Sequence, residues 1–209
     1  AAIDFGILDV FGIDGVSIPS DQLLIDTHLF RQLDLTQSWS LNRRFDAVIC
    51  LEVAEHLDVS AANGLIKALT THSDFVLFSA APPWQSGQHH INCQAPSYWQ
   101  EIFNRHGFVC SDEVRWRLWN DSIVEHWYRQ NMFVARYAPG EAGAENRIDP
   151  IVHPELLPFI VNDYKRSTKK AAYLERTSQI ESGIMPAQWY FETLIKGIHN
   201  KIERQFFGA

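Results

Sequence analysis

Short apolar runs separated by polar segments dominate the first two thirds of the chain. Residues 47–51 and 75–78 are continuous apolar runs of strand length, rich in β-branched and aromatic side chains. Such runs are typical of strands buried on both faces, as in parallel sheets that are covered by helices. Residues 9–14 and 28–35 are predicted to be two earlier strands. We therefore predict an α/β protein with an open, mostly parallel sheet.

Helical periodicity appears between and after these strands. Residues 58–71 and 98–106 place apolar side chains three or four positions apart, which predicts an amphipathic helix in each segment. Residues 108–116 and 127–137 are predicted to be two further strands, joined by a short polar connection. Helices that alternate with strands are expected to cover both faces of the sheet.

The composition changes after Tyr137. Residues 138–153 contain Pro and Gly without an apolar period and are predicted to be a linker. Residues 154–209 are predicted to form a helical C-terminal extension, in which residues 186–207 begin with a proline and carry one apolar face. The sheet domain then covers residues 1–137. The apolar helix faces need a partner, which we expect to be the sheet domain or the second copy of a homodimer.

Charge is distributed unevenly along the chain. The formal net charge is −7, yet residues 151–209 contain eight Lys and Arg against six Asp and Glu. The excess of negative charge therefore lies in the first 150 residues. An acidic body argues against a broad phosphate-binding surface, so nucleic acid is not the expected partner.

Targeting signals and disulfides are not expected. No apolar run approaches the roughly 20 residues of a membrane span, and the N-terminus lacks the basic start and apolar core of a signal peptide. The three cysteines lie far apart, and Cys50 and Cys110 fall within apolar strands, where a buried thiol is the usual arrangement. We predict a cytoplasmic protein without a disulfide framework and without a membrane partner.

A polar cluster follows the first of the two apolar runs. Glu52, Glu55 and His56 stand at positions i, i+3 and i+4, so a helical turn here would project all three from one face. The loop after the next strand carries His89 and His90. Because ligands gather at the carboxyl ends of strands in open α/β sheets, we predict that these residues line an active site.

Three interpretations of this cluster remain open. Carboxylates and imidazoles together would form a divalent-metal site, with Glu52, Glu55, His56 and His90 as ligands. Without a metal, His56, His89 or His90 would act as a general base, because an imidazole pKa of about 6.5 allows it to take a hydroxyl proton near neutral pH. The third interpretation gives these residues structural roles only.

The order of these motifs resembles that of class I S-adenosylmethionine (SAM)-dependent methyltransferases. Residues 45–57, with the sequence FDAVICLEVAEHL, are similar to the fourth strand of that family and the turn after it. Residues 11–15, 32–36 and 74–79 are similar to the ends of its second, third and fifth strands. The resemblance covers roughly residues 1–137. It implies a Rossmann-like sheet with an antiparallel last strand, methyl transfer as the activity and SAM as the cofactor.

Specific cofactor contacts follow from the resemblance. Asp14, followed by Gly15, would accept hydrogen bonds from the ribose hydroxyls, although an Asp-Gly pair also suits a simple turn. Asp34 would accept a hydrogen bond from the adenine amino group, and Leu35 would pack on the ring. The pocket residues implied after the next strand are Leu51 and Glu52.

One part of the family pattern is missing. Class I methyltransferases begin with a strand and a glycine-rich loop that passes under the methionine part of the cofactor. These elements would precede Ala1, and no G-x-G-x-x-G motif occurs elsewhere in the sequence. We expect either that the chain starts late within a longer domain or that another element fills the gap.

Three functions are consistent with these patterns. The first is SAM-dependent methylation of a hydroxyl oxygen on a small molecule or glycan. The second is a methyltransferase-like fragment that holds no cofactor and serves as a binding or assembly module. The third is a metal-dependent RNA 2′-O-methyltransferase, because E-x-x-E-H with a later His resembles the Mg²⁺ site of small-RNA 3′-end 2′-O-methyltransferases. A serine-hydrolase function is disfavoured because the sequence has no G-x-S-x-G motif.

Overall fold

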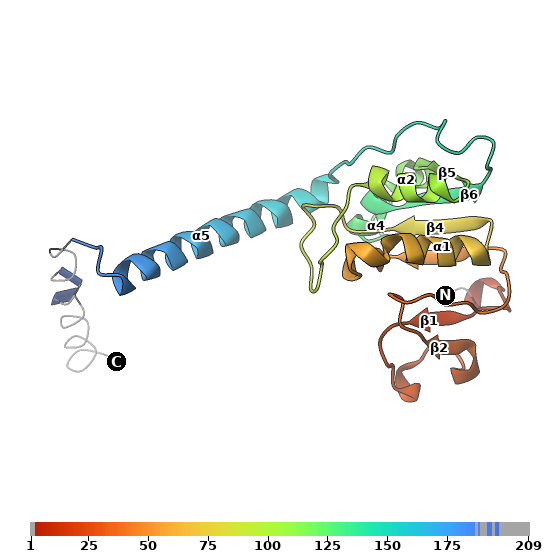
Figure 1. Ribbon diagram of the computed structural model, residues 1–209, viewed down its shortest axis with the longest axis horizontal. Helices are drawn as coiled ribbons and strands as arrows, with labels where there is room; N and C mark the ends of the chain where they lie inside the picture. Colours follow the sequence, from red (N-terminus) through yellow and green to blue (C-terminus); the bar gives the residue numbers. More distant parts are fainter. Residues whose placement is uncertain (1–2, 187, 189–191, 194, 197–209) are drawn as a thin grey trace. The chain divides into compact units, whose positions relative to one another are not determined.

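Four of the apolar strands form one sheet in the computed structural model (Figure 1). Its order is β3 (Val48–Leu51), β4 (Phe75–Ser79), β6 (Phe133–Tyr137) and β5 (Phe108–Ser111). β3 pairs in parallel with β4, whereas β6 is antiparallel to both of its neighbours, β4 and β5. Three strands therefore share one direction and the last strand opposes them, which confirms the predicted fold class.

The structure describes residues 3–186, 188, 192–193 and 195–196. By its contacts the chain divides into two units, the first ending at Ile160 and the second beginning at Val161. The sheet and all the predicted site residues belong to the first unit.

A separate two-stranded sheet lies near the start of the first unit. β1 (Gly12–Asp14) and β2 (Phe30–Gln32) pair in parallel, with Asp14 opposite Gln32. β1 covers only the last three residues of the strand predicted over residues 9–14, and β2 covers three residues within the strand predicted over residues 28–35. Among the described residues β3 is paired only with β4, so its other edge is open, and Ile49 on β3 is 67% exposed.

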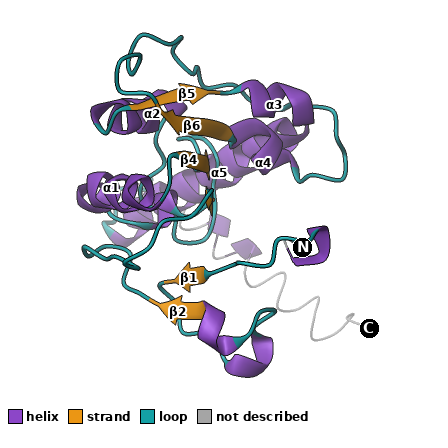
Figure 2. Ribbon diagram, turned by 90° about the vertical axis from the view of Figure 1, so that its right-hand side faces the viewer, coloured by secondary structure: helices purple, strands orange, loops and turns teal. Residues whose placement is uncertain are grey.

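Helices cover both faces of the four-stranded sheet, as predicted. Figure 2 shows α1 (Ala62–His72) and α2 (Pro96–Arg105) on one side of the strands, and α3 (Glu113–Leu118) and α4 (His126–Asn131) on the other. α1 follows a short turn, Val59–Ala61, in which the Ser60 amide donates to the Asp58 carboxylate. α2 begins at Pro96 and ends before Gly107, whose φ of +82° suits glycine.

The prediction of two long final strands was wrong in part. The strands themselves are shorter, because residues 113–118 and 126–131 form α3 and α4 instead. In this region Trp116 and Trp119 contact each other with ring centroids 5.3 Å apart, at the i, i+3 spacing of a helix. Asp112 likewise pairs with Arg115 three residues later. A short run of apolar and charged residues does not distinguish a strand from a helical turn.

Aromatic side chains form the centre of the core between the sheet and α2. The Phe78 side chain is fully buried, and its ring centroid lies 5.4 Å from that of Trp99, 5.4 Å from that of Phe103 and 5.3 Å from that of Phe133. Ile66 of α1 is also fully buried in this cluster. Residues from two strands, β4 and β6, and from two helices, α1 and α2, thus stabilise the sheet.

The segment predicted to be a linker packs against α2 and β5, within the first unit. Residues 139–150 form no helix or strand, yet the Ile148 side chain is buried and its amide donates to Gln100 Oε1 at 2.8 Å. Glu145 Oε1 accepts hydrogen bonds from Asn104 Nδ2 at 2.6 Å, Gln100 Nε2 at 3.1 Å and the Cys110 amide at 3.1 Å. Burial would raise the pKa of Glu145, but these hydrogen bonds outweigh it and lower the pKa to about 2.

We expect Glu145→Gln to lower the free energy of unfolding at pH 7 by about 1 to 2 kcal/mol, because the charged acceptor is lost. The folded-state pKa lies below the ordinary value of 4.5, so this contribution is present above pH 4.5 and is lost as the pH falls toward 2. Urea unfolding of wild type and variant at pH 7 and pH 3 should show the difference shrinking at the lower pH. Glu141→Gln, an exposed change in the same segment, is the control. An equal difference at both pH values would contradict the prediction.

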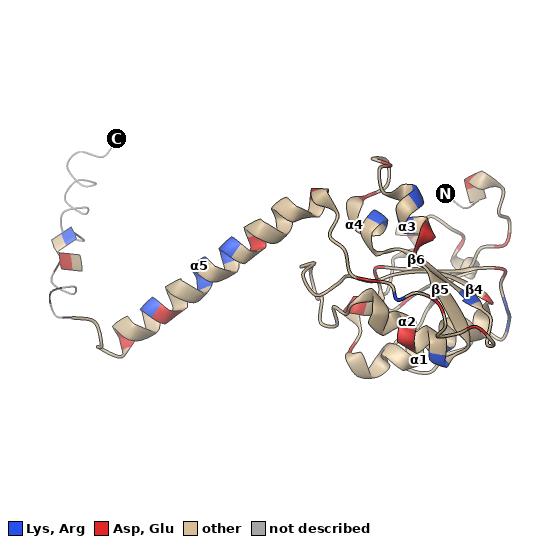
Figure 3. Ribbon diagram, turned by 90° about the horizontal axis from the view of Figure 1, so that it is seen from above, with Lys and Arg blue, Asp and Glu red and all other residues tan. Residues whose placement is uncertain are grey.

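The C-terminal part of the structure is helical, as the sequence suggested. α5 (Leu157–Glu181) follows a short turn, Pro154–Leu156, and Figure 3 shows basic and acidic residues interspersed along it. Several of its apolar side chains are exposed, namely Leu157, Phe159, Val161, Tyr164, Tyr173 and Leu174. Most of the predicted helix over residues 186–207 lies outside the described residues. The homodimer stays a prediction, and no helix of the described part is long and apolar enough to cross a membrane.

Candidate active site

The candidate site begins where β3 ends. The amide of Glu52 donates to the carbonyl oxygen and to the Oγ of Ser79, the last residue of β4, each at 3.0 Å. The φ of Glu52 is 52°, in the left-handed region that residues other than glycine seldom occupy. Strained backbone of this kind persists where the surroundings enforce it, and it is concentrated at functional sites. The chain therefore turns sharply at Glu52 before it enters a short 3₁₀ turn, Ala54–His56.

Two side chains outside the predicted set hold the carboxylate of Glu52. Its Oε2 accepts a hydrogen bond from Gln85 Nε2 at 2.8 Å, and its Oε1 accepts one from Asn131 Nδ2 at 3.1 Å. Asn131 Nδ2 also donates to Gln85 Oε1 at 2.9 Å, which closes a ring of three side chains. Sequence reasoning missed Gln85 and Asn131. For Asn131 the sequence does contain a signal, because the polar run Arg129–Gln130–Asn131 lies directly before the apolar strand β6.

Glu55 joins the turn after β3 to the loop after β4. Its carbonyl oxygen accepts hydrogen bonds from the amides of Ile91 at 2.9 Å and Asn92 at 3.0 Å, which holds the histidine-bearing loop against the turn. The Glu55 side chain is 0% exposed, and neither carboxylate oxygen has a hydrogen-bond partner. Buried polar atoms without partners are rare in folded proteins, and each one calls for an explanation.

Burial and charge both act on the Glu55 carboxyl. Burial raises its pKa, the negative charge of Glu52 raises it further, and the result is about 7. The backbone amides of Glu55 and Ala81 favour the ionised Glu55 carboxylate and so lower its pKa, although neither amide is in hydrogen-bonding geometry. The pKa of the Cys93 thiol is raised as well, first by burial and then by Glu55 and Glu52. The site therefore favours an added proton or cation beside Glu55.

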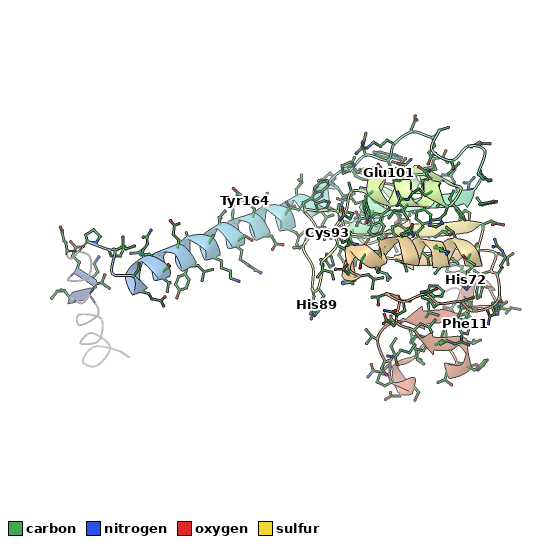
Figure 4. All side chains as sticks on the ribbon, viewed as in Figure 1. Phe11, His72, His89, Cys93, Glu101 and Tyr164 are labelled. Atoms are coloured by element: carbon green, nitrogen blue, oxygen red, sulfur yellow. The ribbon has the colours of Figure 1, made fainter. Side chains whose placement is uncertain are left out.

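Two imidazoles lie beside this carboxylate. The His56 and His90 rings meet edge to face, with centroids 4.9 Å apart. His56 Nδ1 lies 3.2 Å from the carbonyl oxygen of His89, and His90 Nδ1 lies 3.0 Å from that of Gln85. His89 itself is exposed at the tip of the loop (Figure 4), with a φ of 58°. The structure brings His56 and His90 together but does not bring the His89 imidazole to them.

Gly87 makes room for the His90 ring. A Cβ atom at position 87 would lie 2.2 Å from His90 Nε2 and 2.3 Å from His90 Cε1. Atoms cannot approach so closely, so any side chain at position 87 would displace the His90 imidazole from its observed position. The role of Gly87 is not readable from the sequence, because its φ is unremarkable and the contact is tertiary.

The cofactor residues predicted from the resemblance lie at or just after strand ends. Asp14 ends β1, and its Oδ1 accepts a hydrogen bond from the Val16 amide at 2.8 Å. Asp34 Oδ1 accepts from the Thr36 hydroxyl at 2.6 Å and from the Thr36 amide at 2.9 Å, and these bonds lower the pKa of Asp34. Leu35 is buried, Leu51 is half-buried and Gly15 is exposed. Among the described residues no group bonds to the Oδ2 of Asp14 or Asp34, so both acids fit a ligand that donates hydrogen bonds.

The first unit thus has a Rossmann-like α/β fold, with its polar cluster at the carboxyl edge of the four-stranded sheet. Several solved structures are similar to the chain, and three of them contain bound S-adenosylhomocysteine. Magnesium protoporphyrin IX methyltransferase (ChlM) from Synechocystis PCC 6803, with bound S-adenosylhomocysteine (SAH), is 19% identical with a TM-score of 0.37, over 52% of this chain and 51% of that one. DhpI in complex with SAH is 18% identical with a TM-score of 0.37, over 53% and 55%.

The third is the O-methyltransferase of a trans-AT PKS multienzyme from Brevibacillus brevis, in complex with S-adenosyl-L-homocysteine. It is 14% identical with a TM-score of 0.38, over 64% of this chain and 60% of that one. The chain therefore spans about half the length of the first two proteins and somewhat more of the third. Comparison with protein-family profiles gives no match, and comparison with curated proteins gives none.

Proposed function

We propose that this chain is a SAM-dependent methyltransferase domain that transfers a methyl group to a hydroxyl oxygen of a small molecule or glycan. The observation that carries the proposal is the order of acidic residues along the strands. Asp14 ends β1, Asp34 follows β2 by two residues, and Glu52 follows β3 directly. Strand ends of this kind are where open α/β folds bind nucleosides.

Each acid has the contacts that its proposed role needs. Asp14 and Asp34 use Oδ1 to close their own turns, and they keep Oδ2 for the ribose hydroxyls and the adenine amino group. Gln85 and Asn131 hold the carboxylate of Glu52 in one orientation, which suits a pocket wall. Bound SAM would supply a methyl group already activated as a sulfonium, so the protein has to align the acceptor and remove one proton.

Proton removal is assigned to the imidazoles beside Glu55. His56 and His90 each direct Nδ1 toward a backbone carbonyl oxygen, so the neutral ring carries its proton there and its lone pair on Nε2. A lone pair on a neutral imidazole is a suitable base for a hydroxyl group near neutral pH. His89 is exposed at the loop tip and is proposed only as an acceptor contact.

The net charge of the first 150 residues and a tryptophan on the histidine-bearing loop support the proposed acceptor class. The acidic first 150 residues disfavour a polyphosphate backbone, which supports a small molecule or a glycan over RNA. Trp84, on the histidine-bearing loop, has a buried indole N–H without a partner, and a hydroxyl-rich acceptor would satisfy it.

Calorimetric titration with SAH tests the proposal. We expect Asp14→Asn to weaken SAH binding about 10-fold to 100-fold, because the amide keeps the acceptor for the Val16 amide but loses the second acceptor oxygen. Asp21→Asn, an exposed acid in a loop of the same unit, should bind like wild type.

Two results would contradict the proposal. If wild type shows neither heat nor a thermal shift with millimolar SAH, the chain does not hold the cofactor, and the binding-module hypothesis is favoured. If both variants bind SAH as tightly as wild type, Asp14 does not contact the nucleoside.

A further inference from the structure

We propose that Glu55, His56 and His90 bind a divalent transition-metal cation, through one carboxylate oxygen and the Nε2 atom of each imidazole. Among the described residues these three form the one group of His, Cys, Asp and Glu side chains whose ligand atoms all lie within 4.8 Å of one another. The inference goes beyond methyl transfer, because a cation can bind here whether or not the cofactor does.

The buried carboxylate is the first argument. Glu55 is 0% exposed, and both of its oxygens lack hydrogen-bond partners. A buried charged group is stable only when it is paired, hydrogen-bonded or bound to a metal. Among the described residues neither oxygen has a Lys or Arg as a partner, and another carboxylate, that of Glu52, acts on Glu55. A cation at this point would neutralise both acids.

The orientation of the imidazoles is the second argument. Histidines that bind metals usually donate the other ring N–H to a carbonyl or carboxylate, which selects the tautomer and holds the ring in place. Both histidines have this second contact, His56 with the His89 carbonyl oxygen and His90 with the Gln85 carbonyl oxygen. The backbone therefore fixes both tautomers with the lone pair on Nε2.

Backbone hydrogen bonds between the loop and the turn are the third argument. The carbonyl oxygen of Glu55 accepts the Ile91 and Asn92 amides, so the residues next to His90 are bound directly to the residue that supplies the carboxylate. Gly87 leaves no Cβ under the His90 ring, where one would lie 2.2 Å from Nε2. Backbone contacts thus bring the second imidazole to the carboxylate.

The ligand set indicates the kind of cation. Two imidazole nitrogens and one carboxylate oxygen suit Mn²⁺, Fe²⁺, Co²⁺ or Zn²⁺, whereas Mg²⁺ and Ca²⁺ prefer oxygen ligands. Glu52, predicted from the sequence to be a ligand, is held by Gln85 and Asn131 and lies outside the group. Three protein ligands leave coordination positions for water or for an acceptor hydroxyl. A bound cation would lower the pKa of such a hydroxyl, and the two imidazoles would then be ligands instead of bases.

Direct metal binding tests the inference without an activity assay. The full chain is stripped of metal and titrated calorimetrically at one pH near neutrality with Mn²⁺, Co²⁺, Zn²⁺ and Mg²⁺, and Co²⁺ binding is also followed by visible absorption. We expect one site per chain, and at least about tenfold tighter binding of Co²⁺ and Zn²⁺ than of Mg²⁺.

The variants locate the site. His56→Ala and His90→Ala should each weaken Co²⁺ binding at least about tenfold, and Gly87→Ala should weaken it by displacing the His90 ring. His89→Ala, next in sequence but exposed at the loop tip, is the matched control and should bind like wild type. Circular dichroism confirms that each variant is folded.

Either of two outcomes would overturn the inference. One is the absence of saturable binding at millimolar metal, which would leave a proton as the partner of Glu55. The other is binding that persists unchanged in both His56→Ala and His90→Ala, which would place the metal elsewhere. Because SAH titration does not involve these three side chains, failure of the metal site and failure of the proposed methyl transfer are distinguishable.

Discussion

Replacement of Phe78 by alanine is expected to lower the free energy of unfolding by about 4 kcal/mol. The Phe78 side chain is fully buried, and its ring lies against those of Trp99, Phe103 and Phe133. Truncation removes the transfer free energy of the ring and leaves a cavity among aromatic groups that pack too rigidly to close it. The loss is a large fraction of the roughly 5 to 15 kcal/mol by which folded domains are usually stable.

Phe75→Ala is the matched control for this change. Phe75 lies on the same strand but points to the opposite face, where it is only half-buried and has the Arg136 guanidinium 5.9 Å from its ring centroid. We expect its truncation to cost less than half as much. Urea unfolding followed by circular dichroism and tryptophan fluorescence measures both. Equal losses would mean that the core is not centred on Phe78.

A carboxylate at position 131 is expected to have the second large effect. Asn131 is 3% exposed and donates through Nδ2 to Glu52 and to Gln85. Asn131→Asp removes both donated hydrogen bonds and places a further negative charge beside Glu52, close to Glu55. We expect a loss of about 2 to 4 kcal/mol at pH 7, since an unpaired charge in a buried site is costly.

Two further variants separate charge from lost hydrogen bonds. Asn131→Ala removes the donors without adding a charge and should cost about half as much as Asn131→Asp. Asn63→Asp makes the same chemical change on the exposed face of α1 and should cost almost nothing. Thermal unfolding of the four proteins under one buffer condition gives the comparison. If Asn131→Ala and Asn131→Asp were equally destabilising, repulsion by Glu52 would not contribute.

The sequence alone determined the sheet and the position of the site along the chain. The apolar runs at β3 and β4 are too short and too continuous for surface helices, and a change from apolar to acidic residues marks the end of β3. The helical periods of α1 and α2 were readable for the same local reason. The short elements α3 and α4 were not, because helix and strand patterns are alike over six residues.

Only the tertiary structure decided which polar residues act together. Glu52, Glu55 and His56 are neighbours in sequence, and a helical turn would have placed all three on one face. Gln85 and Asn131 hold the Glu52 carboxylate beside the group, so that of the four predicted ligands only Glu55, His56 and His90 have ligand atoms within 4.8 Å of one another. These contacts join residues 33 to 79 positions apart. Residue type and spacing predict only local geometry. Which residues come together at the candidate site depends on backbone turns and long-range hydrogen bonds, and these form only in the folded chain.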